Sequence, residues 1–169
     1  MTVLENLMMV PGIQSGEQIL TAWFRRDAIR EEERANRRKA DEVIEFLHLN
    51  RVAHDRAGNL SGGQKKLLEL GRTMMVEAKV VLLDEVGAGV NRTLLQYIGD
   101  AIVRLNQERG YTFCMIEHDM DLISKLCDPV IVMADGKLLT EGSAEEVKSN
   151  PDVIEAYLGT GMKSNTGAA

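Results

Sequence analysis

Apolar side chains recur every three or four positions through the first half of the chain, which is the spacing of helices that bury one face. This pattern predicts a short helix within residues 1–10 and a long, densely charged helix over about 21–48. A third helix is predicted after Ser61, a favourable N-cap, because Gln64 completes the S-x-x-Q pattern of a capping box. We therefore expect residues 1–76 to form a mostly helical subdomain.

From residue 79 the helical spacing gives way to short, unbroken apolar runs. The runs 80–83 and 113–116 both end in charged residues, and a helical pattern over about 91–107 separates them. Such runs are typical of strands that are buried on both faces of a parallel sheet. A strand, a helix and a strand at this spacing predict a right-handed crossover unit. The expected fold class is α/β, with a mostly parallel sheet within residues 77–161.

The remainder of the chain predicts smaller elements. Residues 130–133 form a third apolar run, and Asp135-Gly136 predicts a hairpin turn into a strand near Leu138. Three further helices are expected, over about 120–126, 143–148 and 152–158. We expect residues 162–169 to form a disordered tail.

Composition and charge narrow the class of protein. The net charge of −6 argues against nucleic-acid binding, which requires a basic face. No apolar run approaches the roughly 18–20 residues that span a bilayer, and the first residues lack the basic segment of an export signal. Cys114 and Cys127 do not have the spacing of metal ligands, so we expect them to be buried thiols of a cytosolic protein.

Two parts of the chain carry residues suited to phosphate chemistry. The glycines after Ser61 leave backbone N–H groups uncovered at the positive end of a helix dipole, which attracts phosphate. Asp84 and Glu85 end one predicted strand and His118 follows another, and ligands of parallel sheets bind beyond such strand ends. An aspartate can hold Mg²⁺ and a glutamate can activate water. Each feature alone is also explained by an ordinary capped helix or a charged strand end.

Taken in order, these motifs resemble the ATP-binding subunit of ABC transporters. The resemblance identifies 60–64 as the signature motif, the strand ending in Asp84-Glu85 as the Walker B strand, 88–91 as the D-loop and His118 as the switch histidine. Within the family, three segments are similar to the branched-chain amino-acid uptake group, namely Thr2–Leu7, Ile116–Met120 and Asp135–Gly159. The resemblance extends over residues 1–161.

The resemblance implies that two subunits, identical or different, sandwich ATP and Mg²⁺ head to tail on the cytoplasmic face of membrane-spanning permease subunits. No nucleic acid takes part. The signature residues would meet the γ-phosphate held by the opposite subunit; they are Ser61, Gly62, Gly63 and Gln64. Asp84 would serve Mg²⁺, Glu85 the attacking water and His118 the γ-phosphate.

The D-loop implied by the resemblance consists of Ala88, Gly89, Val90 and Asn91. Asn91 stands where aspartate is commoner in the family, although the amino-acid uptake group often has asparagine there. Val86 stands where proline usually follows Asp-Glu, which changes the rigidity of that turn and leaves the carboxylates unaffected.

A phosphate-binding P-loop, G-x-x-x-x-G-K-[ST], is not found in the sequence. The nearest match, Gly58–Lys65, carries Gln64 where the lysine is needed, and Gly159–Ser164 is out of register. In the family this loop, an adenine-stacking aromatic and a glutamine loop precede the segment that resembles Thr2–Leu7. The chain is therefore expected to correspond to the C-terminal part of such an ATPase.

Two other interpretations remain open. The chain could be a non-catalytic interaction module that offers its Ser61 turn and its helical face to a complete ABC ATPase. It could also resemble ABC proteins of translation or DNA repair, but its acidic balance and the ordinary length of its helical part weigh against that class.

The missing P-loop predicts that a polypeptide of these 169 residues does not bind ATP tightly, since the main contacts to the triphosphate are absent. Equilibrium titration with Mg-ATP should show only weak binding. A dissociation constant in the micromolar range would contradict this expectation.

Overall fold

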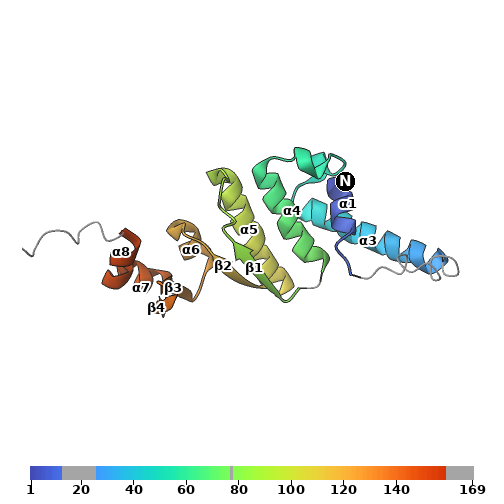
Figure 1. Cartoon of the computed structure of the whole chain (residues 1–169). Coiled ribbons are helices and arrows are strands. Elements are labelled where there is room, and N and C mark those ends of the chain that lie inside the picture. The colour runs from blue at the N-terminus through green and yellow to red at the C-terminus, as the bar shows by residue number, and fades with distance from the viewer. Residues whose placement is uncertain (13–25, 77, 159–169) are drawn as a thin grey trace, which may run out of the picture. The chain divides into compact units, whose positions relative to one another are not determined.

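The computed structural model describes residues 1–12, 26–76 and 78–158 (Figure 1). These residues divide into two compact units, Met1–Cys114 and a second one that begins at Met115. Both helices and strands occur from residue 80 onward, so the predicted α/β fold class is confirmed. The predicted start of the long helix, residues 21–25, and the predicted tail, 162–169, lie outside the described residues.

The first unit contains four α-helices, two short 3-10 helices and two strands among its described residues. In chain order they are α1 (Val3–Met8), α3 (Arg26–Phe46), η2 (Asn50–Val52), η3 (Ala57–Asn59), α4 (Gly62–Met75), β1 (Val80–Asp84), α5 (Arg92–Arg109) and β2 (Thr112–Ile116), whose last two residues belong to the second unit. The second unit continues with α6 (Met120–Leu126), β3 (Val130–Ala134), β4 (Lys137–Gly142), α7 (Ala144–Ser149) and α8 (Pro151–Leu158).

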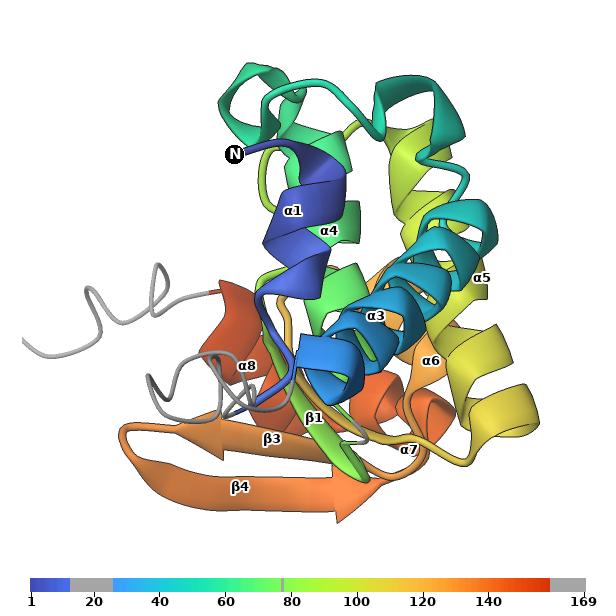
Figure 2. The ribbon, with the colours of Figure 1, turned by 90° about the vertical axis from the view of Figure 1, so that its right-hand side faces the viewer.

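Helices α1, α3 and α4 form the first core (Figure 2). They approach closely at Gly71, where an added Cβ would lie 2.9 Å from Leu47 Cδ1, 3.0 Å from Val43 Cγ1 and 3.3 Å from Leu7 Cδ2. The Leu7 and Leu47 side chains are fully buried there. Since interiors are close-packed, even one added methyl group at Gly71 would force these side chains apart. Side chains from all three helices thus contribute to this packing.

Capping boxes start three of the helices. In each, the N-cap side chain accepts from a backbone N–H three residues later, and the side chain at that later position accepts from the N–H of the N-cap. The pairs are Thr2 with Glu5, Ser61 with Gln64, and Ser143 with Glu146. The bond from the Ser143 N–H holds the pKa of the Glu146 carboxyl below its usual value, and Thr2 lowers the pKa of Glu5 in the same way.

Strands β1 and β2 are hydrogen-bonded neighbours, and the Thr112 N–H donates to the Lys79 carbonyl at 2.8 Å near the start of both. One face of β1 is covered, since Val81 is buried. On the other face, Val80 and Leu82 are 60% and 77% exposed. The prediction that this strand is buried on both faces is therefore wrong for the chain by itself.

Strand β2 shows the same alternation, and Ile116 is 65% exposed. Cys114 lies on the exposed positions of this strand, and Cys127 is half-buried after α6. The prediction of two buried thiols is thus wrong, because the described residues provide no second layer over β2.

The second unit is built on a β-hairpin (Figure 2). Asp135 and Gly136 have φ values of 50° and 73°, the left-handed conformation that two-residue hairpin turns require, so the predicted hairpin is confirmed. Its inner face packs on helices α6, α7 and α8 through a small core of four buried residues, Ile123, Val130, Val147 and Val153. Its outer face leaves three large apolar side chains exposed, namely Ile131, Met133 and Leu138.

The strands of the described residues form two separate pairs, β1 with β2 and β3 with β4, and the second pair is antiparallel. Among the helices that the structure describes, none combines the length and the apolar character that a membrane span requires.

Exposed apolar strand faces predict that the 169-residue chain associates as its concentration rises. Met133→Lys on β3 should weaken this association, because a charge on the exposed face opposes pairing. Met9→Lys is the control, since Met9 is equally exposed but follows helix α1. Sedimentation velocity over a concentration series measures the effect. A monodisperse monomer with a sharp two-state melt would contradict the prediction.

Candidate functional site

The turn at the start of α4 is held by its own side chains. The Ser61 N–H donates to Gln64 Oε1 at 3.0 Å, and the Gln64 N–H donates to Ser61 Oγ at 3.4 Å. The first N–H groups of a helix have no partners within the helix. The capping box uses those of Ser61 and Gln64, so the amides of Gly62 and Gly63 are the remaining donors of this turn. Ser61 and Gly62 are exposed, whereas Gly63 is buried.

The loop between β1 and α5 carries the predicted D-loop and lies against this turn. An added Cβ at Gly62 would be in van der Waals contact with the Gly89 carbonyl oxygen, at 3.9 Å. Gly89 has φ 71° and so adopts a conformation that favours glycine. Asn91 caps α5, because its Oδ1 accepts from the Leu94 N–H at 3.0 Å. The structure thus brings the Ser61 turn and the 88–91 loop together within the first unit.

Asp84 and Glu85 lie at the end of β1 with exposed side chains. Glu85 has a positive φ of 45°, which is uncommon for a residue with a side chain. Such strained backbone is found preferentially at functional sites, where the surrounding structure maintains it. Here the Ala88 N–H donates to the Glu85 carbonyl at 3.1 Å, and the next residue, Val86, is buried. Val86 therefore anchors the turn by packing, at the position where the family usually has proline.

His118 belongs to the second unit and directly precedes the N-cap of α6. Its side chain is exposed, and its N–H donates to Glu117 Oε2 at 3.4 Å. The neighbouring Asp119 caps α6, since its Oδ1 accepts from the N–H groups of Asp121 and Leu122. The backbone around His118 is therefore ordered by the start of a helix.

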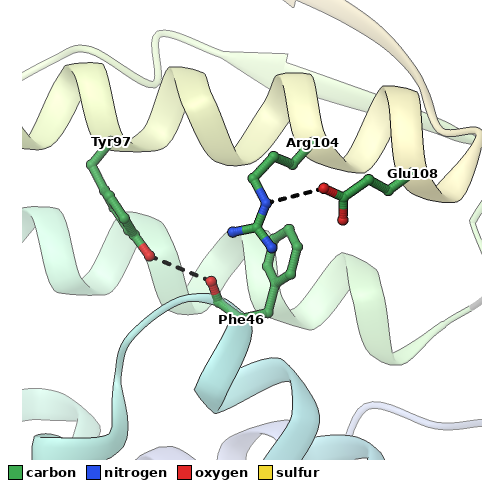
Figure 3. Close-up of polar contacts among 4 residues, drawn as sticks. All are labelled: Phe46, Tyr97, Arg104 and Glu108. Atoms are coloured by element: carbon green, nitrogen blue, oxygen red, sulfur yellow. Dashed lines mark hydrogen bonds and ion pairs between the residues drawn. The ribbon is translucent and has the colours of Figure 1, made fainter.

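Helix α5 is fixed to the end of α3 by contacts that the sequence did not suggest (Figure 3). The Tyr97 hydroxyl donates to the Phe46 carbonyl at 3.4 Å, and burial raises the pKa of that hydroxyl. The Arg104 guanidinium lies 4.1 Å above the Phe46 ring and is oriented by Glu108, 3.4 Å from its Nε. Only the Arg104–Glu108 pair had a signal in the sequence, the i, i+4 spacing of opposite charges. These contacts keep α5, and with it the loop before it, close to the helical subdomain.

The carboxylate of Asp84 suits a magnesium ion shared with a nucleotide. Mg²⁺ usually binds proteins through one or two carboxylates and takes its other ligands from phosphate and water. Among the described residues there is no group of three or more His, Cys, Asp or Glu side chains that could hold a metal ion. A single carboxylate such as that of Asp84 could be the protein ligand of a Mg²⁺ ion bound together with a triphosphate.

Two family profiles match parts of the chain. The profile of the family described as "ABC transporter" matches residues 1–88, just over half of the chain. The profile described as "Branched-chain amino acid ATP-binding cassette transporter" matches residues 137–163. The first match contains both the Ser61 turn and the strand that ends in Asp84-Glu85.

Solved structures show the same fold. The ADP conformation of an ATP-binding cassette of an ABC transporter matches with a TM-score of 0.73 and 37% identity, over 94% of this chain and 63% of that one. A nucleotide-free ATP-binding cassette from an ABC transporter matches with a TM-score of 0.74 and 38% identity, over the same shares. The fold is therefore that of part of an ATP-binding cassette. The chain belongs to the ABC transporter family.

Curated relatives indicate the subgroup. The "Probable branched-chain amino acid transport ATP-binding protein LivG" of Archaeoglobus fulgidus is 42% identical over 159 residues, which are 94% of this chain and 60% of the relative. The protein of the same name from Methanocaldococcus jannaschii is 40% identical over 94% of this chain and 62% of the relative. The "High-affinity branched-chain amino acid transport ATP-binding protein BraF" of Pseudomonas aeruginosa is 35% identical. The chain thus spans about 60% of the length of these relatives.

The capping box predicts the cost of changing Ser61. Ser61→Ala should destabilise the chain by about 1 kcal/mol, because α4 loses the acceptor for the Gln64 N–H. Ser61→Asp is the matched variant, since aspartate caps as well as serine and should retain the stability. Urea unfolding followed by circular dichroism measures both. Equal losses for the two variants would show that the cap is not what stabilises the turn.

Proposed function

We propose that this chain contributes to the ATP-binding and ATP-hydrolysing subunit of an importer for branched-chain amino acids. The observation that carries the proposal is the packing of a capped serine-glycine turn against the loop that follows Asp84 and Glu85. This arrangement occurs in a chain of the ABC transporter family whose relatives are named as ATP-binding proteins of branched-chain amino acid transport.

The functional residues are proposed to serve two different nucleotides. Ser61 and the amides of Gly62 and Gly63 would bind the γ-phosphate of an ATP held by the P-loop of an opposite subunit. Positive charge at the start of α4 and donated N–H groups favour that anion. Of these three residues at the start of α4, Ser61 and Gly62 are exposed and Gly63 is buried.

The strand-end groups would serve the nucleotide on the chain's own side. Asp84 would hold Mg²⁺, which supplies charge compensation at the phosphates when bound. Glu85 would orient the attacking water and accept its proton, and His118 would hold the γ-phosphate. Phosphoryl transfer of this kind relies on positioning and on electrostatic stabilisation of the phosphate oxygens. The positive φ of Glu85 supports its role, because strained backbone conformations occur preferentially at functional sites.

The missing P-loop means that these 169 residues provide only part of such a site. A complementary part of a cassette, with a strand and a P-loop, would complete it. The exposed apolar faces support this requirement, because Leu82 and Met133 are 77% and 66% exposed on strands whose other faces are covered. Large exposed apolar surfaces mark places where another protein segment binds.

The proposed partners are a second ABC ATPase subunit, identical or different, and membrane-spanning permease subunits. The helical subdomain would contact the permease, and the assembly would lie on the cytoplasmic face of the membrane. The names of the relatives, which refer to branched-chain amino acid transport, support this assignment.

A second candidate function is a non-catalytic module that binds a complete ABC ATPase. The observation that favours it is the intact Ser61 turn in a sequence without a P-loop. In that case the turn would complete the partner's nucleotide site, and Glu85 would have no nucleotide of its own to act on.

Substitution of Glu85 distinguishes the two functions. The chain is combined with the part of the Archaeoglobus relative that it does not match, and ATP hydrolysis is measured. Glu85→Gln should lower the rate about 100-fold or more, because the water loses its base. Glu141→Gln, at an exposed position of β4, should leave the rate unchanged.

The same variants are then tested with a complete ABC ATPase as the partner. Stimulation that requires Ser61 and does not change with Glu85→Gln would identify the non-catalytic module. If neither combination hydrolyses ATP faster than the partner alone, the proposed function is wrong.

A further inference from the structure

The two glycines of the Ser61 turn have different surroundings. A Cβ added at Gly63 would lie 1.7 Å from Leu94 Cδ2 and 2.8 Å from Leu94 Cγ, distances that real Cβ atoms do not adopt. A Cβ added at Gly62 would meet only the Gly89 carbonyl oxygen, at an ordinary 3.9 Å. A methyl group at Gly63 would therefore displace the Leu94 side chain, whereas one at Gly62 would displace nothing.

Leu94 is held in place where it meets Gly63. Its N–H donates to the Asn91 side chain, and the Leu95 N–H donates to the Asn91 carbonyl at 2.9 Å, so the first turn of α5 is well defined. Further along α5, Tyr97 and Arg104 bind to the end of α3 at Phe46 (Figure 3). The helix cannot move away from the end of α3 without breaking these contacts.

We propose that Leu94 is a positioning residue: its side chain occupies the space left by the missing Cβ of Gly63 and holds the 61–64 turn against the 87–91 loop. The functional importance of this contact rests on the proposed function, since a nucleotide site needs Ser61 and the loop at a fixed separation. The packing of Leu94 against Gly63 is a property of the chain without nucleotide.

This arrangement predicts a distinct result for each substitution. Gly63→Ala forces the Leu94 side chain into another rotamer and pushes the loop away from the turn, because the two side chains cannot share the space. The double variant Gly63→Ala/Leu94→Ala removes the clash. Residues in direct contact give non-additive effects, so the double variant should be no less stable than Leu94→Ala alone.

Thermal unfolding of the 169-residue chain measures these effects. Gly63→Ala should lower the Tm by about 5 °C. Gly62→Ala is the matched control and should leave the Tm unchanged or slightly higher, since alanine favours a helix more than glycine does. Equal effects of the two glycine substitutions, or additive losses in the double variant, would overturn the proposal.

Two spectroscopic measurements report the position of the turn rather than stability. In the unsubstituted chain, nuclear Overhauser effects should connect the Gly63 Hα protons to the Leu94 methyl groups. In Gly63→Ala, amide hydrogen exchange at residues 87–90 should accelerate, and the double variant should restore it. Absence of the Overhauser effects would contradict the proposal even if no variant folds. Neither measurement uses ATP, so a result that contradicts the role of Leu94 is distinguishable from one that contradicts the proposed ATPase role.

Discussion

Strands with apolar side chains on both faces require two covering layers, and the described chain supplies one. In β1 the buried Val81 faces a cover while Leu82, one position later, is 77% exposed. In the hairpin of the second unit, Val130 is buried and Met133 is exposed. Burial of apolar surface contributes about 25 cal/mol per Å² to the free energy of unfolding. An exposed apolar face does not make this contribution. Exposed apolar faces in both units support the proposal that a second polypeptide segment supplies the missing layer.

Local structure could be predicted from the sequence because it depends on neighbouring residues. The S-x-x-Q pattern of Ser61 and Gln64 gives a capping box, and Asp135-Gly136 gives a hairpin with two left-handed residues. Burial could not be predicted in this way. An apolar run indicates that a strand favours a packed layer on each face. Whether Cys114 is exposed depends on which of these layers is present.

In the candidate site, too, local features could be predicted from the sequence and long-range contacts could not. Ser61, Asp84 and Glu85 were predicted as site residues because each belongs to a short sequence motif. Leu94 could not be found, because its contact with Gly63 joins two helices that are distant in sequence. The positive φ of Glu85 also had no signal, since a glutamate does not ordinarily favour that conformation. Conformational strain and contacts between helices are consequences of the assembled fold.

Oxidative labelling of methionines tests most directly whether a second polypeptide segment covers the exposed strand faces. Met133 and Met9 are 66% and 67% exposed and should react at similar rates with hydroxyl radicals in the chain alone. After addition of the part of the Archaeoglobus relative that the chain does not match, labelling of Met133 should fall several-fold while that of Met9 stays the same. Unchanged labelling of Met133 in a mixture at saturating concentration would contradict the account.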